Sequence, residues 1–432
     1  MRKDIIHIGA GELHYEIQGM AEVANDLQRL GLSISRENIG DPVNKGQLLP
    51  QWLKMIVQEA VQCDETYGYC PTKGLLETRE YLAAKVNSEA GVTVHPDDIL
   101  FMNGLGDAVG KIFGFLKRTA RVLMPSPGYT TFTAAEAAHA GSPPTTYFLD
   151  PHRNWLPDLE DIENRIKYNQ AVAGILIINP DNPTGMVWPR QLLQDVVGLA
   201  KKHDLFIICD EVYRNIVYNG RTNVSLAELI GDVPAIVMRS ISKEMPWPGA
   251  RCGWLEIYNA DRDADFRKYV DSIINAKMLE VCSTTLPQKV LPAILAHPEY
   301  SSFLAERVRR YERNANHVYE TFKDMDGVII NRSDGTFYST VLFEDGVIGD
   351  DQTLAIEDQQ ARRYIEELVS APVAHDKRFA YYLLGGCGVC VVPLSSFTTG
   401  LQGFRMTLLE TDEKKFCRMA VTIKSAVLEY LA

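Results

Sequence analysis

The sequence predicts an α/β protein with a mostly parallel sheet, joined to a smaller α+β unit. Through the middle of the chain, short apolar runs rich in β-branched residues alternate with amphipathic helical runs, as in sheets whose strands are joined by crossover helices. In the last third, strand-like runs lie between two long helical patterns instead. The chain has 432 residues, which exceeds one domain of ordinary size, so we expect two.

Four apolar runs are the expected strands of the parallel sheet: residues 122–124, 174–178, 205–209 and 235–238. A helix is expected over residues 189–203, where apolar residues recur at helical spacing. The C-terminal part is expected to contain helices at 299–322 and 413–431 and strands at 328–330, 336–343 and 389–392. An N-terminal helix, about residues 16–30, is expected to pack with that part. The expected domains are a large one, residues 45–320, and a small one made of 1–44 and 321–432.

Composition and charge argue against several classes of partner. The chain has 44 basic and 56 acidic residues, a net charge of −12, which disfavours binding to nucleic acid or to an anionic membrane. No apolar run approaches the roughly 18 residues needed to span a bilayer. Acidic and polar residues soon follow Arg2 and Lys3, so the N-terminus does not resemble a signal peptide. We therefore expect a cytoplasmic protein.

Eight cysteines in a chain of this length do not form a disulfide scaffold. Cys387 and Cys390 form a C-x-x-C pair, but a zinc site would need a second such pair or clustered histidines. We expect these cysteines to be small residues in an apolar strand over residues 385–392, and we expect no metal site.

The loops that follow the expected strands are the candidate site, because ligands of parallel α/β sheets bind outside the carboxyl ends of the strands. Asp210 ends the apolar run at 205–209, and Tyr213 follows in the same segment. A carboxylate buried there needs a cation or hydrogen-bond donors, and a protonated pyridine nitrogen would serve. Taken alone, Asp210 is equally well interpreted as a helix N-cap.

The next loop, residues 179–185, has the sequence N-P-D-N-P-T-G. Its prolines make it rigid, and Pro183 biases Asn182 toward an extended backbone. The loop can therefore aim the Asn182 amide at a ligand, although Asn-Pro also occurs in plain turns.

A third loop carries Ser240, Ser242, Lys243 and Arg251 within 12 residues. Two hydroxyls, an ammonium and a guanidinium suit a phosphate dianion together with a reactive amine. The plain alternative is a solvated basic loop.

Residues 103–110, N-G-L-G-D-A-V-G, open a helical pattern, and their glycines would let backbone amides approach an anion. The spacing G-x-G-x-x-x-G differs from the dinucleotide-binding fingerprint. Tyr129 follows the run at 122–124 and is interpreted either as an aromatic face for a ligand or as a core tyrosine.

Together these loops offer a phosphate cradle, an aromatic ring, a carboxylate, a phenol, an amide and one lysine, which are the groups that pyridoxal 5'-phosphate (PLP) chemistry needs. The chain resembles the class I/II aminotransferases of PLP fold type I, the aspartate-aminotransferase-like family, from about Asn38 to Glu410. The most specific stretches are N-P-D-N-P-T-G, C-D-E-V-Y, and S-I-S-K followed by G-A-R-C-G. The stretch from Tyr15 through Pro42 and the segment F-R-M-T-L-L-E look closest to alanine-type aminotransferases.

The resemblance implies a homodimeric enzyme that moves an amino group between an α-amino acid and a 2-keto acid, with Lys243 forming an aldimine with PLP and acting as general base and acid. It implies that Asp210 pairs with the ring nitrogen, that Asn182 and Tyr213 bond the phenolic oxygen, and that Tyr129 stacks on the ring. The implied phosphate ligands are Gly104, Leu105, Gly106, Ser240, Ser242, Arg251 and, from the other subunit, Tyr67. The implied substrate-carboxylate site contains Gly40, Asn182 and Arg405, whose guanidinium can bind a carboxylate bidentately.

Three features depart from the family pattern. The loop from Leu394 to Gly400, ahead of Arg405, lacks the usual Pro-Gly, and Leu105 and Gly106 replace small or hydroxylated residues, so phosphate binding there rests on the backbone. Glu244 follows the lysine in an unusual K-E-M-P-W-P-G stretch, and its orientation is open.

Other functions remain as alternatives at this point. The same scaffold carries β-lyases and amino-acid decarboxylases, because the cofactor motifs do not select the bond that breaks. A DNA-binding regulator on this domain is disfavoured by the acidic charge and by a resemblance that begins within about 40 residues of Met1. A nicotinamide-dependent dehydrogenase would not need Lys243.

Overall fold

The computed structural model describes residues 5–13, 16–89 and 91–432. Arg2 and Lys3, on which the signal-peptide argument rests, and Tyr15 lie outside the described residues. Within that part of the chain, no helix is both long and apolar enough to cross a membrane.

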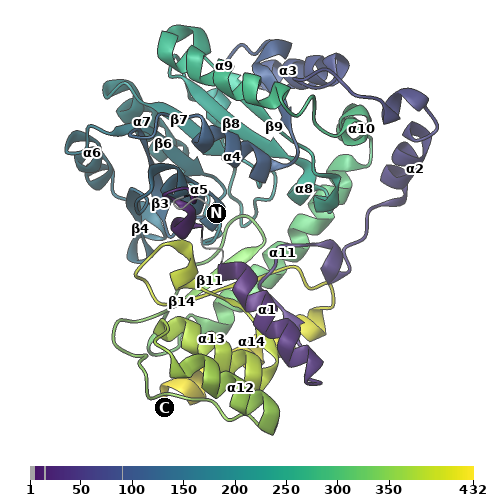
Figure 1. Ribbon diagram of the computed structural model, residues 1–432. Coiled ribbons are helices and arrows are strands. Elements are labelled where there is room, and N and C mark those ends of the chain that lie inside the picture. The colour runs from purple at the N-terminus through teal and green to yellow at the C-terminus, as the bar shows by residue number, and fades with distance from the viewer. Residues whose placement is uncertain (1–4, 14–15, 90) are drawn as a thin grey trace.

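The larger part of the molecule is built on an eight-stranded mixed sheet (Figure 1). Five neighbouring strands pair in parallel, and three antiparallel pairings extend the two edges. All four predicted strands are confirmed as β3, β6, β7 and β8. Across the sheet the order is β2 (Ile99–Met102), β9 (Gly253–Tyr258), β8 (Ala235–Ser240), β7 (Phe206–Asp210), β6 (Val172–Ile178), β3 (Arg121–Ser126), β4 (Thr146–Asp150) and β5 (Leu156–Pro157).

The central strands are apolar along their whole length because helices cover both faces of the sheet. Along β6, Ile175 and Ile177 join one hydrophobic core, whereas Leu176 and Ile178 join another. Each fully buried side chain of this kind contributes about 1.5–3 kcal/mol to stability. The first core includes α2 (Gln51–Ala60), α3 (Leu76–Glu89), α6 (Leu159–Lys167), α7 (Arg190–Lys202) and α10 (Thr285–Leu295). The second includes α4 (Leu105–Gly114), α5 (Thr130–Ala140) and α9 (Ala264–Met278).

The smaller part contains a four-stranded antiparallel sheet (Figure 1). It also contains a third hydrophobic core. Its strands, in spatial order, are β10 (Val328–Ile330), β11 (Tyr338–Phe343), β14 (Gly403–Thr407) and β13 (Val392–Pro393). Its helices are α11 (Tyr300–Phe322), α12 (Gln359–Ser370), α13 (His375–Cys387) and α14 (Glu413–Leu431). The N-terminal α1 (Glu16–Arg29) packs into the same core, as predicted, and β1 (Ser35–Arg36) pairs in parallel with β12 (Val389–Cys390).

The prediction of a strand over residues 385–392 is wrong at its beginning. Residues 385–387 form the last turn of α13, so Cys387 is helical, and only Cys390 lies in a strand. A run buried on all sides lacks the periodicity that separates a helix from a strand. Among the described residues, no three His, Cys, Asp or Glu side chains form a group that could hold a metal ion.

Candidate active site

A cavity of about 230 Å³ opens at the carboxyl ends of β6, β7 and β8. Most of the side chains that the sequence predicts for the site line it: Leu105, Gly106, Tyr129, Asn182, Asp210, Tyr213, Ser240, Ser242, Lys243 and Arg251. A larger cavity of about 620 Å³, which includes residues at the amino ends of β7 and β8, contains none of the predicted site residues.

Lys243 lies in α8 (Ile241–Glu244), a single helical turn that follows β8 directly. Its ammonium donates a hydrogen bond of 2.9 Å to the carbonyl oxygen of Gly40. From α11, the buried guanidinium of Arg307 donates to the carbonyl oxygens of Lys243, at 3.1 Å, and of Glu244. These bonds hold the backbone of the turn in place, so the Lys243 amine extends into the cavity from a fixed backbone.

Asp210 ends β7 and is 5% exposed, and one carboxylate oxygen accepts a 2.9 Å hydrogen bond from the backbone N–H of Val212. Burial raises the pKa of Asp210 to about 7, although that hydrogen bond and the charge of Lys243 act in the opposite direction. The segment that follows is a turn and not a helix, so the N-cap interpretation is wrong. A cation placed against Asp210 would restore its ionised form.

Arg405, on β14, is 2% exposed and makes polar contacts at both ends of its guanidinium. Nη1 donates to the side-chain oxygen of Asn182 at 2.9 Å, and Nη2 donates to the carbonyl oxygen of Asn38 at 2.7 Å. The guanidinium carbon lies 4.1 Å from the ring centroid of Tyr338 and 4.9 Å from that of Phe397. Nε is buried and has no hydrogen-bond partner among the described residues, which leaves it free to bind an anionic ligand.

Asn182 and Tyr213 offer hydrogen-bond donors to the cavity. Because Arg405 occupies the carbonyl oxygen of Asn182, the amide nitrogen is the group that Asn182 can offer to a ligand. In the structure, the hydroxyl of Tyr213 donates a hydrogen bond of 3.3 Å to the hydroxyl oxygen of Tyr338. Burial raises the pKa of Tyr213, so its hydroxyl is protonated at neutral pH and can donate.

The residues predicted to bind phosphate gather at one end of the cavity. α4 begins at Leu105, and the first amides of a helix, which lack intrahelical partners, form an anion site. Gly104 has φ +79°, and a side chain there would place its Cβ 2.1 Å from Nη2 of Arg251. Glycine is therefore required for this close approach. Beside Gly104 and Arg251, the hydroxyls of Ser240 and Ser242 form a hydrogen bond of 2.8 Å with each other.

Tyr129 lines the cavity from the loop before α5, whereas Tyr67 lies outside the cavity. The Tyr67 side chain is 72% exposed, and its hydroxyl donates to the carbonyl oxygen of Val61 at 2.8 Å. Within one chain the structure therefore does not bring Tyr67 to the other predicted site residues.

The structure shows the orientation of Glu244 and the position of the loop from Leu394 to Gly400, which the sequence left open. Glu244 points away from the cavity, because its carboxylate accepts from Asn215, through N and Nδ2 at 3.1 Å, and from the Tyr300 hydroxyl at 2.9 Å. The loop from Leu394 to Gly400 docks on the segment around Tyr129: the backbone N–H of Gly128 donates to the Phe397 carbonyl at 2.9 Å. This docking brings the Phe397 ring to Arg405.

Sequence reasoning missed four residues that complete the site. Tyr338 lines the cavity, Phe397 and Asn38 contact Arg405, and Arg307 holds the lysine turn. Phe397 lies in the loop whose departure from the family pattern was noted. The other three carry no local signal, because their partners are more than 60 residues away in sequence.

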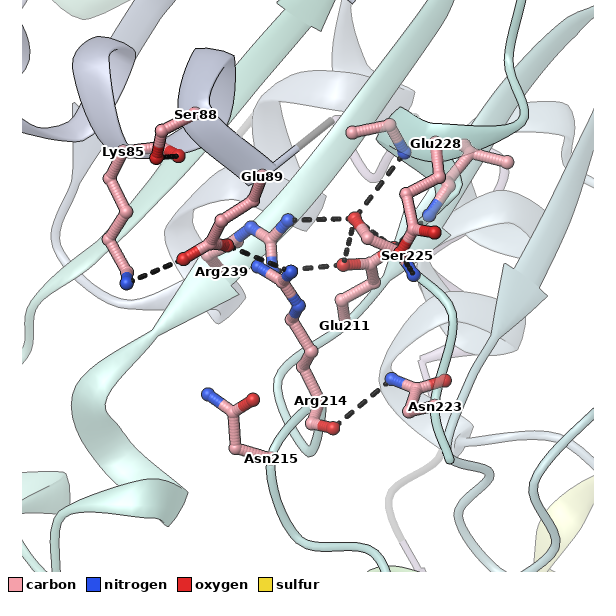
Figure 2. A network of polar contacts seen from close by, with 12 residues as sticks. Lys85, Ser88, Glu89, Glu211, Arg214, Asn215, Asn223, Ser225, Glu228 and Arg239 are labelled. Carbon is pink, nitrogen blue, oxygen red and sulfur yellow. Dashed lines mark hydrogen bonds and ion pairs between the residues drawn. The ribbon is translucent and has the colours of Figure 1, made fainter. Parts of the chain in front are cut away.

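A buried ion-pair network beside the cavity holds β7 and β8 together (Figure 2). Arg239, on β8, pairs with Glu211 and with Glu256, each at 2.9 Å. Ser225 donates to Glu211 at 3.1 Å. Such a network is costly to break because it leaves a buried charge without a partner. Its neighbours along the two strands, Asp210 and Ser240, are therefore held in position.

The residues present fit PLP. The buried Asp210 carboxylate calls for a cation such as the protonated pyridine nitrogen, and the α4 N-terminus with Arg251 suits a phosphate dianion. Lys243 supplies the amine that bonds an aldehyde. All three lie around one cavity.

Comparison with known proteins agrees with this geometry. The model of the family "Aminotransferase class I and II" matches residues 38–427. An uncharacterised aminotransferase of Methanocaldococcus jannaschii is 53% identical over 431 residues, covering 100% of both chains. The glutamate-pyruvate aminotransferase of Escherichia coli K12 is 29% identical, covering 75% of this chain and 79% of its own.

Among solved structures, an alanine aminotransferase from Pyrococcus furiosus superposes with a TM-score of 0.83 at 24% identity and covers 99% of both chains. That likeness shows the shared fold, which is PLP fold type I. The family match and the 53% identity show the family of the chain, which a shared fold alone does not. This chain belongs to the class I and II aminotransferases, the PLP-dependent enzymes that move an amino group between an α-amino acid and a 2-keto acid.

Proposed function

We propose that Lys243 bonds PLP and moves the proton at the substrate Cα, and that the enzyme exchanges the amino group of alanine with that of glutamate through their 2-keto acids. The observation that carries the first part is the convergence of Lys243, Asp210 and Asn182 on one cavity, with Arg405 bonded to Asn182 beside it.

Each polar group around the cavity has a proposed task. When bound, PLP supplies a ring that accepts the electrons released at Cα. Asp210 keeps the proton on the ring nitrogen, and Asn182 and Tyr213 donate to the phenolic oxygen. The amine of Lys243 takes the Cα proton and returns it one bond away. The amides of Gly104, Leu105 and Gly106, with Ser240, Ser242 and Arg251, would hold the phosphate, and Tyr129 would cover the ring.

Arg405 is proposed to bind the substrate α-carboxylate, next to Gly40. Its guanidinium is desolvated, and Nε has no partner among the described residues. A charge-assisted bond to a buried guanidinium is stronger than one in water. The Asn182 bond and the Tyr338 and Phe397 rings hold the group in one plane, which suits bidentate binding.

The choice of alanine and glutamate rests on the relatives. The E. coli relative is named a glutamate-pyruvate aminotransferase, and a Mycobacterium tuberculosis relative, 27% identical over 349 residues, is named an alanine aminotransferase. Among the described residues lining the cavity, the cations are Lys243 and Arg251, and both already have tasks. A substrate with a small uncharged side chain, such as alanine, is therefore accommodated without a further cation, whereas the choice of glutamate rests on the name of the relative alone.

The test is the visible spectrum of the PLP-loaded enzyme with L-alanine, L-glutamate, L-aspartate and L-tyrosine in turn. We expect alanine and glutamate to remove the cofactor band, and pyruvate and 2-oxoglutarate to restore it. Conversion by aspartate or tyrosine alone would contradict the proposed substrates. Release of ammonia or carbon dioxide without interconversion of the band would instead indicate a β-lyase or a decarboxylase.

We also propose a homodimer in which Tyr67 reaches the PLP phosphate of the partner subunit. The hydroxyl of Thr285 donates to the carbonyl oxygen of Gly68 at 2.8 Å, so two segments that carry large exposed apolar side chains lie together. Tyr69 is 85% exposed and Leu279 is 87% exposed, and apolar patches of this kind mark interfaces.

Mixed dimers test the shared site. A dimer of one Tyr67→Phe subunit and one Lys243→Ala subunit has one intact site only if Tyr67 acts on the partner. We expect the mixture to recover activity beyond the sum of the two parents. No recovery in a mixture shown to contain the hybrid would place the action of Tyr67 within its own subunit.

The two remaining proposals concern organisation and location. We propose a large domain of residues 45–320 and a small domain of 1–44 and 321–432. Separate hydrophobic cores support a division into two domains, but α11 falls mostly in the first range and packs into the core of the second, so it joins the two. We propose a cytoplasmic location, supported by eight free cysteines. Limited proteolysis and cell fractionation test them.

A further inference from the structure

We propose that the hydroxyl of Tyr338 is a positioning group that acts through Tyr213: when Tyr213 donates to the phenolic oxygen of PLP, Tyr338 donates to Tyr213. This inference rests on the proposed function, because it takes the role of Tyr213 as given. Tyr338 lines the cavity, and that proposal assigns no hydrogen bond to its hydroxyl.

The Tyr338 side chain is confined to one position. It begins β11, is 3% exposed, and its ring lies under the guanidinium carbon of Arg405 at 4.1 Å from the centroid. A Cβ on Gly40 would lie 2.0 Å from the Tyr338 hydroxyl oxygen, so the hydroxyl is packed against the Gly40 backbone. Its oxygen is 3.3 Å from that of Tyr213. Rotation away from Tyr213 would break the ring contact with Arg405.

The charges around the two phenols favour Tyr338 as the donor. Burial raises the pKa of both groups, but the positive charges of Lys243 and Arg405, together with the hydrogen bond that Tyr213 donates to Tyr338 in the structure, bring the pKa of Tyr338 below its ordinary value. The pKa of Tyr213 stays raised, by burial first and then by Tyr338. Each hydroxyl can both donate and accept. Once Tyr213 directs its proton to a ligand, the hydrogen bond between the two hydroxyls reverses. Tyr338, whose pKa the charges of Lys243 and Arg405 still lower, then donates to the Tyr213 oxygen.

The consequence is a shift in the proton affinity of the cofactor. A chain of two hydrogen bonds is stronger than its separate members, so Tyr338 strengthens the donation of Tyr213 to the phenolic oxygen. That donation draws negative charge from the phenolic oxygen. The oxygen then attracts less strongly the proton on the nitrogen that joins Lys243 to PLP. The proton therefore leaves at a lower pH than it would without Tyr338.

The test is the pH midpoint of the visible absorption change in PLP-loaded Tyr338→Phe, which keeps the ring on Arg405 and removes only the hydroxyl. We expect the midpoint to rise by about half a unit to one unit, the equivalent of one hydrogen bond. The matched control is Tyr218→Phe: Tyr218 is also buried, and its hydroxyl donates to the Gly335 carbonyl at 2.9 Å, outside the cavity lining. We expect that control to leave the midpoint unchanged.

A double-variant cycle decides whether Tyr338 acts through Tyr213. We expect Tyr213→Phe to raise the midpoint further than Tyr338→Phe does, and the double variant to match Tyr213→Phe alone. An unchanged midpoint in Tyr338→Phe, or the same added shift in the Tyr213→Phe background, would overturn the inference while the proposed function stands. If Tyr213→Phe itself leaves the midpoint unchanged, the role proposed for Tyr213 fails, and the inference fails with it.

Discussion

Replacing Asp210 by asparagine is expected to stabilise the cofactor-free protein above pH 7 while weakening its hold on PLP. The pKa of Asp210 lies at about 7 in the fold against an ordinary value of 3.8. A raised pKa means that the ionised carboxylate destabilises the fold. That penalty is absent below about pH 4 and complete above about pH 7. The difference of about 3 pH units corresponds to at most about 4 kcal/mol.

Asparagine removes this penalty but introduces a cost of its own. Its oxygen can keep the hydrogen bond from Val212, whereas a side-chain amide nitrogen left without an acceptor would lower the stability of the fold by about 1–3 kcal/mol. The expected net gain for Asp210→Asn at pH 8 is therefore about 1–3 kcal/mol. With an unfolding entropy of about 2.1 cal/mol/K per residue over 432 residues, each kcal/mol raises Tm by roughly 1 °C.

The assay is the Tm of the cofactor-free wild type and variant at pH 5 and at pH 8. The gain in Tm should be present at pH 8 and should shrink at pH 5, where the wild-type carboxyl is largely protonated. In the presence of PLP the order should reverse, because the variant cannot pair with the ring nitrogen. A lower Tm for cofactor-free Asp210→Asn at pH 8 would refute the reasoning.

A second buried carboxylate serves as the control. Asp376 accepts from the backbone N–H and the hydroxyl of Ser395, at 2.8 and 2.6 Å, and from the backbone N–H of Gly403 at 3.3 Å. Alanine at this position would leave the backbone N–H groups of Ser395 and Gly403 without their acceptor, so Asp376→Ala should lower Tm at both pH values. A gain from both variants would show that removal of any buried carboxylate stabilises this chain.

Two further substitutions test the substrate side of the site. Arg405→Lys should raise KM for the amino acid by about tenfold to a hundredfold, since it replaces a bidentate donor by a point charge, while PLP stays bound. An unaltered KM would count against carboxylate binding by Arg405. Gly40→Ala should lower kcat/KM by at least about tenfold, because its Cβ would lie 2.0 Å from the Tyr338 hydroxyl. Gly198→Ala, whose Cβ meets nothing within 4 Å, is the control and should keep full activity.

The cofactor-facing part of the site was accessible from the sequence because of the topology of parallel sheets. β6, β7 and β8 lie side by side and run in one direction, so the loops after their carboxyl ends meet at one edge. Asn182, Asp210 and Lys243 could therefore be expected at one edge of the sheet, and the family resemblance then gave each of them a role. The register of the strands was not required.

The substrate-facing part depends on contacts that local sequence does not encode. Tyr338 reaches Arg405 because β11 pairs with β14 in a particular register, with Thr340 opposite Arg405. Arg307 reaches the backbone of Lys243 from α11, 64 residues away. A one-residue shift of β11 would turn Tyr338 to the other face of its sheet, so only the tertiary structure identifies this residue.

The central claim is that Lys243 carries the cofactor and moves the proton, and Lys243→Ala tests it most directly. The measurement compares wild type and variant after loading with PLP and reduction with borohydride, by visible absorption and by mass spectrometry of peptides. We predict that wild type gains one covalently bound cofactor at Lys243, that the variant gains none, and that the variant loses at least about 10³-fold in kcat. A covalent cofactor in the variant, or an unchanged rate, would contradict the account.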